Sequence, residues 1–146
     1  MERVGFYLSG EKPVEQVVPL IARAAKRAGE RLLVVARQEE RLDSLDKALW
    51  EQCPEDFLAH GRAGQPHSAR QPLLLSDKCE AENGARLIAL ADGEWRDEAE
   101  GFDRVLLFFE DAGREAARET WRRFSDRQDI RREFYEFQDG KWVHKA

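Results

Sequence analysis

The segment MERVGFYLSGEKPVEQVVPLIARAAKRAGERLLVVARQ, residues 1–38 of a chain of 146, decides the fold. It contains two short apolar runs, at residues 4–8 and 32–36, whose length and residue types predict buried strands. Between them, apolar residues recur every three or four positions over 13–27, which predicts a helix with Pro13 in its first turn and Gly29 after its last. A strand, a helix and a strand in this order predict a βαβ unit with parallel strands.

The rest of the chain extends this pattern. We expect a second helix at residues 38–50, a long loop at 53–72, and a third helix at 111–125. Further strands are expected at 73–76, 85–90 and 104–109, and a strand or hairpin edge at 134–143. The sequence therefore predicts one α/β domain over residues 1–146, a three-layer sandwich with a mostly parallel sheet.

The composition excludes several classes of protein. The chain is 42% hydrophobic and 36% charged with a net charge of −5, which favours a folded domain and disfavours general binding to duplex DNA. Cys53 and Cys79 are expected to be reduced thiols. No apolar run approaches the ~20 residues of a membrane span, and residues 1–8 do not read as a signal peptide. We expect a cytoplasmic protein that contacts no membrane.

Motifs for cofactors and catalysis are missing. The loop at residues 9–13 has one glycine and an acid, and neither G-x-G-x-x-G nor G-x-x-x-x-G-K-[ST] occurs. His60 and His67 lie near Cys53 and Asp56, a spacing that supports a metal site poorly. The acidic residues at 92–100 are typical of a solvated turn. We expect no cofactor and no catalysis, with a small nucleotide- or metal-dependent enzyme as the alternative.

The third predicted helix carries a basic and aromatic constellation. Arg114, Arg118 and Arg122 are four residues apart, so they form one drifting row beside Trp121. Glu119 and Arg123 are spaced to pair on a neighbouring row. Such a surface suits a short acidic peptide that ends in an apolar residue and a carboxylate. The alternative is an ordinary amphipathic helix with solvated arginines.

A second constellation follows the second helix. The motif Leu45-Asp46-Lys47-Ala48-Leu49-Trp50 closes that helix, and Phe57-Leu58-Ala59-His60 opens the loop. Exposed aromatic residues at such positions mark a protein interface more often than an active site. We predict that Trp50 and Phe57 are exposed and lie away from the third helix; the alternative is that both cover the edge of the core.

These segments resemble the chi subunit family of the bacterial DNA polymerase III holoenzyme, accessory proteins of the clamp loader. The resemblance covers nearly the whole chain and rests mainly on L-D-x-x-L-W followed by F-x-x-H. It also includes the segments Phe6-Tyr7-Leu8, Arg41-Leu42-Asp43, Phe102-Asp103-Arg104 and Ala117-Arg118-Glu119.

The resemblance implies a mononucleotide-binding-like topology without a nucleotide site, and a bridging role in DNA replication. Chi proteins bind the acidic C-terminal tail of single-stranded DNA-binding protein and join the clamp loader through the psi subunit, without reading DNA sequence. The family's tail-binding positions correspond here to Leu107, as an apolar floor, and to Arg114, Arg118, Trp121 and Arg122. Its psi-facing aromatics correspond to Trp50 and Phe57.

This chain departs from the family in three details. It uses arginine where relatives use lysine, and Trp121 where a tyrosine stands, which keeps the charge and the aromatic ring while changing the donor geometry. It also has Ala59 where a proline is expected.

Overall fold

The computed structural model describes residues 1–52 and 54–146. Its sheet has eight strands in the order β3-β4-β2-β5-β6-β1-β7-β8, and all neighbours are parallel except the antiparallel pair β7 and β8. The strands are β1 (Arg3–Gly10), β2 (Leu32–Val35), β3 (His60–Arg62), β4 (Leu73–Ser76), β5 (Leu87–Leu90), β6 (Arg104–Glu110), β7 (Arg131–Gln138) and β8 (Lys141–His144). The helices are α1 (Val14–Arg27), α2 (Glu39–Glu51) and α3 (Arg114–Arg123), with short 3-10 turns η1 (Pro54–Asp56), η2 (Ser68–Arg70), η3 (Asp97–Gly101) and η4 (Asp111–Gly113).

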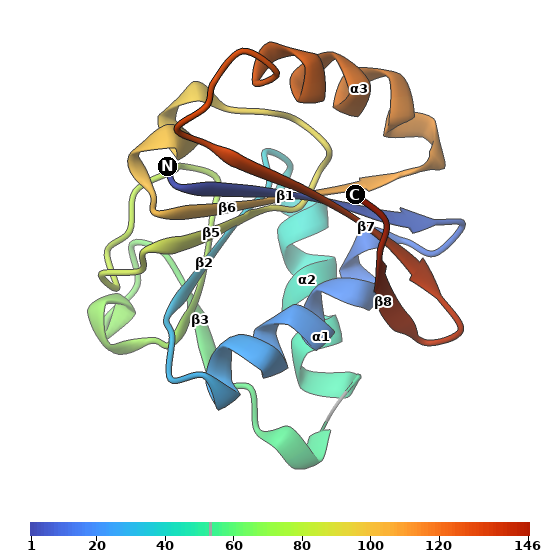
Figure 1. Cartoon of the computed structure of the whole chain (residues 1–146). Coiled ribbons are helices and arrows are strands. Elements are labelled where there is room, and N and C mark those ends of the chain that lie inside the picture. Colours follow the sequence, from blue (N-terminus) through green and yellow to red (C-terminus); the bar gives the residue numbers. More distant parts are fainter. Residues whose placement is uncertain (53) are drawn as a thin grey trace.

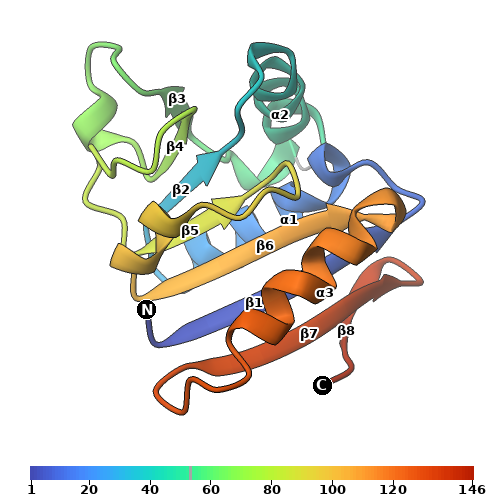
Figure 2. The same ribbon diagram turned by 90° about the horizontal axis from the view of Figure 1, so that it is seen from above.

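Helices cover both faces of the sheet. Figure 1 shows α3 above the sheet and α1 and α2 below it. From above, α3 lies across β1, β6 and β7 (Figure 2). The prediction of a three-layer α/β sandwich with a mostly parallel sheet is confirmed. Within the described ranges, no helix is long and apolar enough to cross a bilayer.

The βαβ unit forms as its sequence predicts. Helix α1 buries one apolar stripe and ends where Gly29, at φ +72°, turns the chain through the left-handed region that glycine adopts without strain. The N–H groups of Gly29 and Glu30 donate to the carbonyls of Lys26 and Ala25, which closes the last turn. Pro13 precedes the first helical residue instead of lying within the first turn.

Two further expectations needed correction. The stretch at 53–72 is not all loop, because residues 60–62 form edge strand β3 beside β4. Helix α3 begins at Arg114, since residues 111–113 form a 3-10 turn first. The expected hairpin edge at 134–143 is confirmed, because β7 and β8 form an antiparallel hairpin at one edge of the sheet, where β7 also pairs with β1.

Side chains alternate between two cores along the central strands. On β1, Val4, Phe6 and Leu8 are buried in the core that also contains residues of α3, whereas Tyr7 is buried in the core under α1 and α2. The Tyr7 ring stacks on Tyr135 of β7, with ring centroids 4.8 Å apart. Strand β1 is therefore buried on both sides, as parallel strands between helical layers are.

An ion pair with a buried carboxylate joins β1 to β7. The Glu133 side chain is 7% exposed and accepts two hydrogen bonds from Arg3, of 2.8 and 3.1 Å, and one from the Tyr135 hydroxyl. Burial alone would raise the pKa of the Glu133 carboxyl, but the hydrogen bonds and positive charge of Arg3 outweigh it and lower the pKa. The carboxylate therefore stabilises the fold at neutral pH.

We predict that Glu133→Gln lowers the free energy of unfolding by about 1–2 kcal/mol at pH 7, because a charged hydrogen-bond acceptor is lost. The folded-state pKa is lowered, so this stabilisation is present above the unfolded carboxyl pKa of about 4.3 and is lost as the pH falls through the folded value. Urea unfolding at pH 7 and pH 3 measures the difference. Glu119→Gln, at an exposed position, is the control; equal effects of both variants would contradict the assignment.

Candidate functional site

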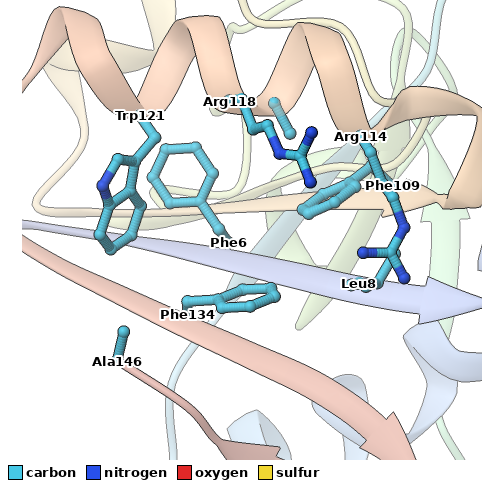
Figure 3. A pocket seen from close by; sticks show the side chains of 9 residues that line it. Phe6, Leu8, Phe109, Arg114, Arg118, Trp121, Phe134 and Ala146 are labelled. Carbon is cyan, nitrogen blue, oxygen red and sulfur yellow. The ribbon is translucent and has the colours of Figure 1, made fainter.

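A cavity of about 330 Å³ lies between α3 and the sheet. Its walls come from β1, β6, β7, the first two turns of α3 and the residue at position 146 (Figure 3). The lining residues are Phe6, Leu8, Phe109, Arg114, Ala117, Arg118, Trp121, Phe134 and Ala146. The cavity is therefore apolar except for two guanidinium groups.

Aromatic rings form most of the apolar wall. Phe6 meets Trp121 edge to face, with ring centroids 5.0 Å apart, and Phe134 is the register neighbour of Phe6 on β7. Trp121 is half-buried, and the Arg132 guanidinium lies 4.4 Å from its ring centroid. The Arg132 Nη1 also donates to the Trp121 carbonyl at 2.8 Å, which satisfies a carbonyl near the end of α3. The Trp121 ring is therefore packed between Phe6 and Arg132.

Arg114 and Arg118 supply the charge at this cavity. Both side chains extend from α3 toward the sheet and lie beside Leu8 and Phe109 in Figure 3. Each pairs with a carboxylate close in sequence, Arg114 with Asp111 at 3.0 Å and Arg118 with Glu115 at 2.8 Å. These pairs are exposed and therefore weak, so an incoming carboxylate can replace the local one at little cost.

Two of the predicted tail-binding residues, Arg122 and Leu107, do not line this cavity, and Arg123 pairs with a different carboxylate from the one expected. Arg122 is exposed and does not line the cavity, because eight residues of helix turn it about 80° from Arg114 while Trp121 stays within about 20°. Leu107 is fully buried in the core on the same side as α3, and the cavity opens on the other flank of Phe6, over β7. Arg123 pairs with Asp97 at 3.1 Å instead of with Glu119.

Sequence reasoning did not assign six of the nine lining residues to this site, namely Phe6, Leu8, Phe109, Ala117, Phe134 and Ala146, and it did not assign Arg132. Phe109 and Phe134 line the cavity, Ala146 closes one end, and Arg132 supports Trp121. The continuous apolar run of β6 predicted that Phe109 is buried, and its position two residues after Leu107 placed it on the same face of the strand. Phe134 had no such signal, since its place beside Phe6 depends on the order of strands in the sheet.

Trp50 and Phe57 are the two exposed large hydrophobic side chains of the described residues, 55% and 75% exposed. Trp50 lies near the end of α2 and Phe57 follows η1, and α2 covers the face of the sheet opposite α3 (Figure 1). The prediction that they are exposed and lie away from the third helix is confirmed.

The loop that carries Phe57 is held by α1. Lys26 Nζ donates to the carbonyls of Asp56 and Phe57, and Arg23 pairs with Asp56 at 3.4 Å. Phe57 has φ +45°, a left-handed conformation that is unfavourable for a bulky side chain. The contacts from α1 therefore offset the strain of a conformation that presents the Phe57 ring to solvent.

Among the described residues, the alternative metal site is not assembled. His60 and His67 were its candidate ligands, but the His60 side chain is only 1% exposed and bonded to Asp46 and Leu58, and His67 is exposed. Across residues 1–52 and 54–146, no three His, Cys, Asp or Glu side chains are grouped to hold a metal ion. Cys53, and with it the expectation for its thiol, lies outside the described residues. Cys79 is half-buried, and burial raises the pKa of its thiol.

The acidic run at 92–100 forms ion pairs. Asp92 accepts hydrogen bonds from Arg96, at 2.8 and 2.9 Å, and from the Arg37 backbone N–H. Burial alone would raise the pKa of the Asp92 carboxyl, but these bonds outweigh it and lower the pKa. Asp97 pairs with Arg123. Asp92 and Asp97 are therefore engaged in ion pairs with Arg96 and Arg123.

A carboxylate of the protein caps the N-terminus of α1, the end of a helix that can bind an anion such as phosphate. Glu110 Oε2 accepts a hydrogen bond of 2.9 Å from the N–H of Val14, the first residue of α1. A helix N-terminus attracts anions, and here the Glu110 carboxylate is the anion. This contact argues against the nucleotide-dependent alternative.

A protein-family model described as "DNA polymerase III chi subunit, HolC" matches residues 1–130. The chain belongs to this chi family. "DNA polymerase III subunit chi" of Escherichia coli (strain K12) is 30% identical to it over 135 residues, which covers 85% of this chain and 91% of that protein. The suspected resemblance is therefore confirmed.

The family match covers most of the cavity of this chi-family protein. Arg114, Arg118 and Trp121 fall within residues 1–130, as do Trp50 and Phe57. Phe134 and Ala146 lie beyond the matched segment, so one wall of the cavity comes from a part of the chain that the family model does not reach.

Proposed function

We propose that this chi-family protein is a non-catalytic adaptor that tethers the DNA polymerase III clamp loader to single-stranded DNA coated by its binding protein. The cavity beneath α3 carries this proposal, because it combines an aromatic pocket with two arginines at its edge. In the proposed complex it holds the acidic C-terminal tail of single-stranded DNA-binding protein. The Trp50/Phe57 surface holds the psi subunit or an equivalent clamp-loader partner.

The chemistry of the cavity suits a peptide that ends in a phenylalanine. The terminal ring enters the space between Phe6, Trp121 and Phe134, where aromatic edges and faces surround it. The terminal carboxylate meets Arg114 or Arg118, whose planar guanidinium groups bind carboxylates with two parallel hydrogen bonds. The buried ring and this carboxylate supply most of the affinity.

The charge around α3 suits the acidic part of the same peptide. Residues 114–132 contain seven arginines and four acidic residues, although the whole chain has a net charge of −5. A local positive field of this kind accelerates the encounter with an acidic tail and weakens as salt screens it. Arg122 contributes here through its charge and not through contact with the buried ring.

We predict that Arg118→Ala weakens binding of a synthetic acidic peptide ending in Phe about ten- to hundredfold, since a charged hydrogen bond is lost. Arg122→Ala removes the same charge from the same helix outside the cavity, and it should weaken binding no more than about threefold. Calorimetric titration at two salt concentrations measures both effects. Equal losses of affinity in the two variants would show that only the overall positive charge of α3 matters. Unchanged affinity in both variants would show that the peptide binds elsewhere on the protein.

We predict that Phe57→Ala abolishes capture of purified psi subunit and changes the free energy of unfolding by no more than about 0.5 kcal/mol, because the ring is 75% exposed. Binding of the tail peptide to the opposite face should stay as in the wild type. Pull-down with psi and thermal unfolding measure the two effects. A variant that unfolds would show that Phe57 belongs to the core, and undiminished capture would show that psi docks elsewhere.

A further inference from the structure

His60 of the F-x-x-H motif has no part in the function proposed so far, yet it is the most enclosed ionisable side chain near the Trp50/Phe57 surface. It is the first residue of β3, and its side chain is only 1% exposed. Its Nδ1 lies 2.7 Å from the Leu58 carbonyl oxygen and its Nε2 lies 2.7 Å from Asp46 Oδ1. Both ring nitrogens therefore have short contacts to oxygen.

Both contacts tie the ring to groups on other segments. The Leu58 oxygen is a backbone carbonyl, which accepts a hydrogen bond from the ring. The Asp46 oxygen belongs to a carboxylate on α2. An enclosed polar side chain is tolerated when its polar atoms are paired in this way.

The same ring supports both parts of the exposed surface. Its centroid lies 4.4 Å from that of Trp50, so it packs against the exposed tryptophan. Its bond to Leu58 fixes the residue directly after Phe57, and its bond to Asp46 fixes α2 one turn before Trp50. One side chain therefore connects α2, the Phe57 loop and the edge strand β3.

The other charged groups around this ring are already paired with one another. On β3, Arg62 pairs with Glu39 and Asp43 of α2. From α1, Lys26 and Arg23 hold the residues on the other side of Phe57. Asp46 is the carboxylate of α2 that pairs with His60.

We propose that His60 is a positioning residue whose two ring contacts fix Trp50 and Phe57 in the geometry a partner binds. The partner role rests on the proposed function, whereas the fixed geometry is a property of the chain alone. The proposal requires both hydrogen bonds, because either one alone leaves α2 or the loop unconnected.

Two half-variants separate the bonds. His60→Asn places an amide N–H near Nδ1 and keeps the donor to Leu58, and His60→Gln places one near Nε2 and keeps the donor to Asp46. We expect each variant to stay folded, to bind the tail peptide on the opposite face as before, and to bind purified psi about tenfold more weakly. His67→Asn is the matched control, since His67 is exposed at φ +70° and asparagine tolerates that conformation.

Amide hydrogen exchange of the protein alone tests the fixed geometry without a partner. We expect the Ala59 N–H, which donates to the Phe57 carbonyl, to exchange faster in both half-variants than in the wild type. Unchanged Ala59 exchange in both variants would overturn the proposal. So would wild-type psi binding in both variants while Phe57→Ala fails to bind. Failure of the wild type itself to bind psi would instead overturn the proposed partner, and the exchange results would still decide the role of His60.

Discussion

The parallel pairing of β1 with β6 and β7 is the constraint on which the rest of the structure depends. Because β1 is buried on both faces, each of its side chains is committed to one of two cores. Phe6 and Leu8 face α3 and form the floor of the cavity, while Tyr7 stacks on Tyr135 in the opposite core. A slip of one residue would exchange the two sets and would remove the cavity together with the packing under α1.

The same sheet keeps the two candidate binding surfaces apart. The cavity forms where Arg114, Arg118 and Trp121 of α3 meet the strands, on one face of the sheet. Trp50 and Phe57 lie at the far ends of elements that belong to the other face. A protein that joins two partners needs this separation, since each partner must bind without displacing the other.

The local pattern of apolar residues predicted most helices and strands of the fold. It did not predict the features that depend on the order of strands in the sheet. The helices and inner strands follow from periodicity, because each buries an apolar face within its own segment. Edge strand β3 was missed because its three residues, His60–Arg62, have no apolar run and are held by contacts to α2. Phe134 was missed because its place beside Phe6 depends on long-range strand pairing that a single strand does not encode. For the same reason the sequence did not show that Leu107 lies outside the lining of the cavity.

The central claim is that two partners bind this chi-family protein at once, on opposite faces of one rigid sheet. Calorimetric titration of an acidic peptide ending in Phe into the protein alone, and into the protein saturated with psi, tests it most directly. The account predicts the same stoichiometry and the same Kd within about twofold in both titrations, since the surfaces share no residue and additivity holds for distant sites. Loss of peptide binding in the presence of psi would contradict it.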